Sequence, residues 1–248
     1  MNRTLCRGIR ARAWHLVALA AVAAVTASCS YRGGELDNPI ARSVTWFSYA
    51  GGDDVRAACG PGARDRIRLI YNGVWDGYLT DAPTQVRTYD IAAVLDGQGA
   101  VMLARVFGEY NMATITLNDP FSVTRPTKVE TTLSPREYAD LKRMLRESGF
   151  FDAAPYGLRL PSNRFWWLAA GCVDGSFRLN GWLYPSDRFT RVTFAAPLAV
   201  LDKTNISPTP PQDVERFPSM RSATGPFGGV PRREPSFILQ LGADRLIN

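Results

Sequence analysis

Apolar and polar residues alternate along several stretches of the chain, which is the pattern of half-buried β-strands. In residues 64–71, three arginines alternate with Ile67, Leu69 and Tyr71. This alternation predicts a strand that turns its apolar side to a core and its arginine side to solvent.

Four further runs continue the pattern towards residue 133. Residues 86–95 and 100–107 are strand-like, and Asp96-Gly97-Gln98-Gly99 between them supplies the glycines of a tight hairpin. Residues 112–117 alternate apolar residues with threonine, and residues 128–133 are rich in β-branched side chains. The simplest assembly is an antiparallel β-meander through residues 65–133.

A strong helix signal follows the meander. Ser134, Pro135 and Glu137 form a capping box with proline at the first helical position. Apolar residues then recur at helical spacing, and Gly149 supplies a terminating residue. The pattern predicts a helix over residues 135–148 that packs one apolar stripe against the sheet.

Strand patterns return after this helix. Residues 165–173 and 176–184 flank Asp174-Gly175, a strong signal for a two-residue hairpin turn. Residues 189–196 alternate and predict another strand, and residues 197–203 predict a short helix. Seven prolines between positions 208 and 235 predict an irregular tail, with one last strand at 237–241.

Together these elements predict an α+β fold. An antiparallel sheet, open or curled into a partial barrel, packs against one main helix. The organisation predicted for the chain is a signal at 1–28, a tether at 29–42, a globular domain at 43–206 and a Pro- and Gly-rich C-terminal segment at 207–248.

The N-terminus has the three regions of an export signal. Four arginines precede the apolar run Ala13–Ala27, and small residues lead into Cys29. The run holds 15 residues, fewer than the roughly 20 that span a bilayer core. Thr26-Ala27-Ser28-Cys29 resembles the lipobox of bacterial lipoproteins, although that family prefers leucine where Thr26 stands.

The resemblance implies that Cys29 is acylated and becomes the first residue of the mature protein. Several acyl chains anchor a protein stably, so the domain needs no membrane-binding surface of its own. Ser30 follows Cys29, whereas enterobacterial lipoproteins retained in the inner membrane carry aspartate there. The resemblance therefore favours the periplasmic face of the outer membrane. The alternative is a plain secretory signal cut near Ala27-Ser28.

Removal of residues 1–28 changes what the composition allows. It takes away four arginines and no acids, so the formal net charge falls from +6 to +2. This leaves little basis for nucleic-acid binding. It also removes His15, the single histidine. The mature chain therefore lacks the residue needed for Ser-His-Asp and Cys-His nucleophile systems and for histidine metal sites.

Two cysteines remain after Cys6 leaves with the signal and Cys29 is acylated. In an oxidising compartment, Cys59 and Cys172 are predicted to form a disulfide that ties the start of the domain to its middle. The alternative is two separate buried thiols.

Motifs for catalysis and cofactor binding are sparse. The sequence has no phosphate-binding loop, metal-ligand spacing or nucleophile elbow, so it predicts neither a cofactor nor a metal. A pair of carboxylates could still serve a glycosidase. The acids near predicted strand ends are Glu109, Asp119, Asp174 and Asp187.

An aromatic cluster lies on the second hairpin, at Trp166, Trp167, Trp182 and Tyr184. Trp166 and Trp167 are adjacent, so they point to opposite faces of the sheet. Either all of these rings pack in the core, or one is exposed and stacks on a sugar or grips a partner.

These observations favour a non-enzymatic envelope lipoprotein that binds an envelope protein or has a structural role. The alternatives are a peptidoglycan or glycan binder that uses exposed tryptophans, and a histidine-free hydrolase that uses a carboxylate pair.

Overall fold

The computed structural model describes residues 31–33, 35–74, 85–95, 99–108, 125–212 and 235–247. Its centre is an open six-stranded antiparallel sheet with the order β4-β3-β2-β1-β6-β7. The strands are β1 (Arg66–Gly73), β2 (Gln85–Ala93), β3 (Ala100–Phe107), β4 (Thr127–Leu133), β6 (Phe165–Val173) and β7 (Ser176–Leu183). The predicted α+β fold with an antiparallel sheet is confirmed, and the sheet does not close into a barrel.

Strand β1 lies at the centre of the sheet. Leu69 pairs with Tyr89 of β2 on one side and with Ala169 of β6 on the other. Strands β1 to β4 follow one another as a meander, and β3 pairs directly with β4. The strand predicted at residues 112–117 lies outside the described residues.

The hairpin predicted at Asp174-Gly175 is confirmed. Val173 pairs with Ser176 across the turn, and both turn residues have positive φ, 50° at Asp174 and 72° at Gly175. A Cβ at Gly175 would lie 2.8 Å from the carbonyl oxygen of Gly60. Glycine is therefore required there by both the backbone angle and the close approach.

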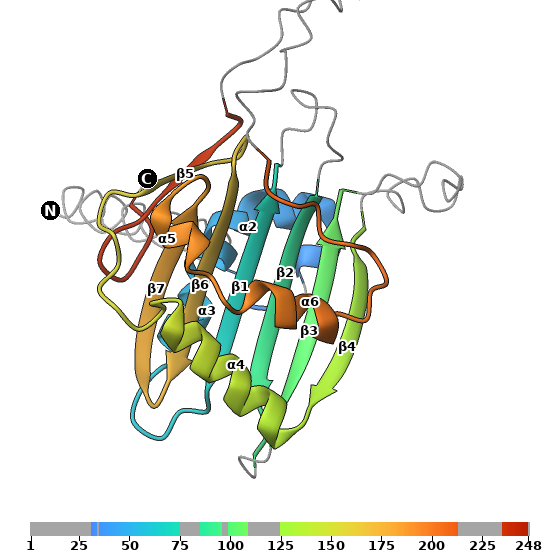
Figure 1. Cartoon of the computed structure of the whole chain (residues 1–248), viewed down its shortest axis with the longest axis vertical. Helices are drawn as coiled ribbons and strands as arrows, with labels where there is room; N and C mark the ends of the chain where they lie inside the picture. Colours follow the sequence, from blue (N-terminus) through green and yellow to red (C-terminus); the bar gives the residue numbers. More distant parts are fainter. Residues whose placement is uncertain are drawn as a thin grey trace, which may run out of the picture.

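Helices cover both faces of the sheet (Figure 1). Helices α4 (Pro135–Glu147), α5 (Asp187–Thr190) and α6 (Ala195–Leu201) lie on the near face, and α2 (Pro39–Gly51) and α3 (Asp53–Ala57) lie behind it. Every residue of β6 is buried as a result. None of the helices in the described ranges is long and apolar enough to cross a bilayer.

Helix α4 confirms the helix predicted at 135–148, with its end at Glu147. The Ser134 side chain accepts from the Glu137 backbone N–H, and the Glu137 carboxylate accepts from the Ser134 N–H at 2.8 Å. Tyr138, Leu141 and Leu145 form its buried stripe against the sheet.

The strand predicted at residues 189–196 is wrong. The Ser186 hydroxyl accepts from the Phe189 N–H and begins the short helix α5, and α6 follows from Ala195. This segment lies over the sheet rather than within it. Phe194 packs edge-to-face on Trp167 and on Trp182, with ring centroids 5.1 and 5.5 Å apart.

The N-terminal segment also differs from its prediction as a tether up to residue 42. Helix α2 begins at Pro39, because the Asn38 Oδ1 accepts from the backbone N–H groups of Ile40 and Ala41. The helix ends at Gly52, whose φ is 66° and where a Cβ would lie 2.5 Å from the Cβ of Ala170. Part of the predicted tether is thus packed protein.

Residues 235–247 of the C-terminal segment pack on the domain. The predicted last strand is present as β8 (Ile238–Gln240), which pairs with β5 (Arg159–Pro161) in a separate two-stranded sheet. Before that, Arg87 and Asp202 form a buried ion pair at 2.6 Å, and the Tyr71 hydroxyl donates to the Thr209 carbonyl at 2.6 Å. These bonds hold the chain after α6 on the sheet.

A disulfide joins Cys59, which follows α3, to Cys172 on β6, with Cα atoms 5.5 Å apart. The predicted pairing is confirmed. The two residues are 113 positions apart in the sequence, and a loop of that length corresponds to a stabilisation of up to about 4–5 kcal/mol in the chain-entropy model. The bridge fixes the N-terminal helices to strand β6.

Candidate functional site

Arg68 is the centre of a buried ion network beneath α2. Its side chain is 1 % exposed. Its Nε donates to Asp90 at 2.6 Å, and its two terminal nitrogens donate to the carboxylate of Asp54 at 2.8 and 3.1 Å. One of these nitrogens also donates to the Tyr49 carbonyl at 2.8 Å. A single guanidinium on β1 therefore joins β2, α2 and α3.

The network continues across the sheet from β2 to β4. The second carboxylate oxygen of Asp90 accepts from Arg105 at 2.7 Å and from the Tyr49 hydroxyl at 2.8 Å. Asp37, in the short helix η1 (Glu35–Asp37), lies 3.7 Å from Arg105 and also pairs with Lys128 on β4. Positive and negative side chains thus alternate from β1 to β4, with Asp37 of η1 between Arg105 on β3 and Lys128 on β4.

The charges of this network offset the effect of burial on the pKa of Asp90. Burial alone would raise the pKa of Asp90, but the guanidinium groups of Arg68 and Arg105 lower it below its ordinary value. Burial raises the pKa of Tyr49 well above its ordinary value, and the neighbouring charge of Asp90 acts in the same direction. Asp90 therefore stays ionised and Tyr49 stays a neutral donor near pH 7.

The solvated arginine face predicted for β1 is wrong at Arg68. Arg64 is exposed and Arg66 is partly exposed, but α2 and α3 cover Arg68. A buried guanidinium must be paired, and Asp54 and Asp90 supply the partners. Alternation along a single strand cannot reveal a second layer that comes from elsewhere in the chain.

Tyr31 is held by this network at the start of the described chain. Its backbone N–H donates to the Ser48 hydroxyl at 3.1 Å. Its ring packs edge-to-face on Tyr49 with centroids 4.8 Å apart, and the guanidinium of Arg68 lies 5.1 Å from the same ring. The side chain is 5 % exposed. Tyr31, two positions after Cys29 in the sequence, is therefore packed in the domain.

The outer face of α2 carries exposed apolar side chains. Trp46, Tyr49 and Ala50 are its buried residues, towards the sheet. On the other side, Ile40, Val44 and Phe47 are 67 %, 54 % and 42 % exposed. Their i, i+4, i+7 spacing places them in one stripe along the helix. We call these three residues the α2 stripe.

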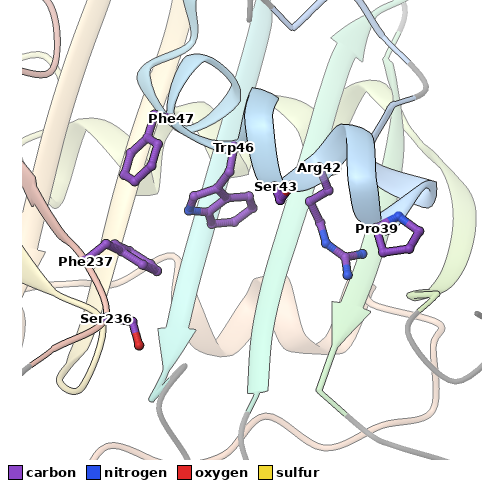
Figure 2. Close-up of a pocket in the computed structure, with 7 residues that line it drawn as sticks. All are labelled: Pro39, Arg42, Ser43, Trp46, Phe47, Ser236 and Phe237. Atoms are coloured by element: carbon purple, nitrogen blue, oxygen red, sulfur yellow. The ribbon is translucent and has the colours of Figure 1, made fainter. Parts of the chain in front are cut away.

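A pocket of about 340 Å³ opens beside the α2 stripe (Figure 2). Phe47 and Phe237 lie together at one end of it, with their rings edge-to-face, centroids 5.8 Å apart and an interplanar angle of 87°. Its lining is mostly apolar and comes from α2 and the segment before β8: Pro39, Arg42, Ser43, Trp46, Phe47, Ser236 and Phe237.

The three tryptophans of the second hairpin are all buried. Trp166 and Trp182 are fully buried, and their indole N–H groups donate to the carbonyls of Pro161 and Ser148 at 2.8 and 2.9 Å. Trp167 lies on the opposite face from Trp166, with its ring 4.8 Å from that of Tyr71. Of the two alternatives for this cluster, core packing or an exposed ring, the structure shows the three tryptophans packed in the core.

The remaining predicted site residues lie apart from one another. Tyr184 is half-buried and packs edge-to-face on Phe165 and Phe189. Asp174 is a turn residue, and Asp187 lies in the first turn of α5. Cys29, Glu109 and Asp119 lie outside the described residues. Within the described ranges, no group of three or more histidine, cysteine or acidic residues is placed to bind a metal.

Sequence reasoning missed α2 and its stripe, although a signal was present. Asn38-Pro39 is an N-cap followed by proline at the first helical position, and it lies within the segment predicted as a tether. Ile40, Val44 and Phe47 then follow with helical spacing. The buried network had no comparable signal, because its members come from seven separate elements, η1, α2, α3 and β1 to β4.

Comparison of the chain with protein-family models, with curated proteins and with solved structures found no match.

Replacement of Arg68 tests whether the network holds the N-terminal helices on the sheet. Arg68→Met leaves two carboxylates without their main partner, so we expect the free energy of unfolding to fall by about 3–5 kcal/mol. Urea denaturation followed by tryptophan fluorescence measures the change. Arg143→Met is the matched control, since Arg143 lies in an exposed ion pair on α4 and its loss should barely move the midpoint. Equal effects of the two variants would contradict the assigned role.

The lowered pKa of Asp90 predicts an acid-sensitive fold. Because the folded pKa lies below that of the unfolded chain, the stabilisation is complete above the ordinary carboxyl value of about 3.9. It is lost as the pH falls through the lower folded value. We expect stability to decline more steeply between about pH 5 and about pH 2 in the wild type than in Asp90→Asn. Parallel declines in urea titrations at several pH values would show that Asp90 is not responsible.

Proposed function

We propose that the chain is a lipid-anchored protein of the bacterial cell envelope, on the periplasmic face of the outer membrane, with a non-catalytic domain that binds an envelope protein or serves a structural role. The proposed localisation is based on the signal in residues 1–28 and on the lipobox that ends at Cys29. The acyl chains on Cys29 supply the membrane attachment.

The observation that carries the proposal furthest is the packing of Tyr31. Two residues of chain reach at most about 7 Å, so an anchor at Cys29 leaves the domain almost no slack above the lipid surface. A flexible tether would instead let a domain sample a wide volume. The position of Tyr31 suits a protein whose place and orientation at the membrane matter.

The buried carboxylates support a non-catalytic role. Asp54, Asp90 and Asp202 are each bonded to an arginine at 2.6–2.8 Å. Carboxylates fixed in this way stabilise a fold, whereas a glycosidase needs two that face each other across a substrate site. The buried tryptophans likewise offer no free ring for a sugar, so we favour a protein partner or a structural role over a glycan.

Metabolic labelling tests the anchor. Cells that express the full chain are grown with labelled palmitate, and we expect the label in the wild-type protein and none in Cys29→Ser. Cys6→Ser is the matched control, because Cys6 belongs to the signal and its loss should leave the labelling intact. An unlabelled wild-type protein, cut near Ala27-Ser28, would overturn the anchor in favour of plain secretion.

Crosslinking in the envelope tests the binding role. A photo-reactive residue is placed at Leu95, Tyr156 or Val200, which are exposed and lie outside α2. Irradiation should give a discrete adduct of higher mass from at least one position, and mass spectrometry then identifies the neighbour. Monomer alone from all three positions would contradict protein binding and leave the structural role.

A further inference from the structure

The α2 stripe is exposed although the helix that carries it is firmly packed. The opposite side of α2 is fixed by Trp46 and Tyr49 in the core and by the bond from Arg68 to the Tyr49 carbonyl. Ile40, Val44 and Phe47 therefore cannot turn inward. Their exposure is a constant property of the folded domain.

The stripe lies next to the point where the chain leads to its anchor. Tyr31 is bonded to Ser48, which follows Val44 by one helical turn, a rise of about 5–6 Å. From Tyr31 the chain reaches Cys29 within about 7 Å. An acyl chain attached at Cys29 thus enters the lipid close to the C-terminal end of the stripe.

The charges of α2 suit a surface of phosphate headgroups. The helix contains Arg42 and no acidic residue. The nearest acid before it, Asp37, is paired with Lys128. Arg42 donates to the Leu36 carbonyl at 3.1 Å and lies over the Phe107 ring, so it is the apolar stripe and the absence of carboxylates on α2 that suit a lipid interface.

From this geometry we infer that the outer face of α2 lies in the lipid surface that holds the anchor, with Ile40, Val44 and Phe47 at the boundary between headgroups and acyl chains. The inference rests on the proposed acylation of Cys29. The acyl chains supply the attachment, and the stripe fixes the orientation, so that the α2 face is towards the lipid and the α4 and α6 face is towards the periplasm.

Depth-dependent quenching tests this orientation. The full-length acylated protein is reconstituted in vesicles of phosphatidylethanolamine and phosphatidylglycerol, with Val44→Cys labelled by an environment-sensitive fluorophore. Its other cysteines are removed with the signal, acylated or joined in the Cys59–Cys172 disulfide. Val200→Cys on α6 is the matched control, because Val200 is also exposed but lies on the opposite face of the sheet. Flotation of the vesicles reports the anchor independently.

We expect the probe at position 44 to emit at shorter wavelength and to be quenched by nitroxide lipids, and the probe at position 200 to show neither effect. Ile40→Glu should reduce the quenching at position 44, whereas Val200→Glu should leave it unchanged; both variants should float with the vesicles. Protein that does not float would overturn the anchor itself. Protein that floats with an unquenched probe at position 44 would overturn the orientation alone, whether the stripe stays in water or is covered by a second copy.

Discussion

The guanidinium of Arg68 is the interaction on which the N-terminal half of the structure depends. It lies at the centre of the sheet and bonds to groups from β2, α2 and α3 at the same time. Because the guanidinium is almost completely buried, water cannot replace a lost partner easily, and removal of its acidic partners leaves a buried charge unpaired. The N-terminal helices are therefore fixed on the sheet through a polar contact as well as through apolar packing.

The opposite face of the sheet uses the same device. Arg87 lies within the apolar layer under α6 and pairs with Asp202, and it also donates to the side chain of Gln85 at 3.0 Å. Gln85 in turn accepts from the Thr209 N–H at 2.9 Å. One buried arginine on each face thus holds the segment that covers it: α2 and α3 on one face, and the irregular chain after α6 on the other. Direction-dependent bonds of this kind specify the position of such segments better than apolar contact does.

Signals in the sequence correctly predicted the elements whose formation depends on residues close together in the chain. The capping box at Ser134 and the turn at Asp174-Gly175 each depend on neighbouring residues, and both are as expected. The prediction of a strand at residues 189–196 was wrong because period-2 alternation also fits an irregular segment that covers an aromatic core. The prediction of a solvated Arg68 was wrong for a related reason, since residues from other elements determine its environment. The candidate site could not be predicted from the sequence, except for the helical spacing of the α2 stripe.

If the chain is exported and acylated as proposed, the burial of Tyr31 bears on the order of these events. An enzyme that modifies Cys29 needs access to the chain around it, whereas Tyr31, two residues later in the sequence, is buried in the folded domain. The contacts of Tyr31 with Tyr49 and Arg68 form only when α2 and β1 are in place. If Cys29 is processed as proposed, acylation precedes folding. The last step of maturation is then the closure of the domain onto its own modified terminus.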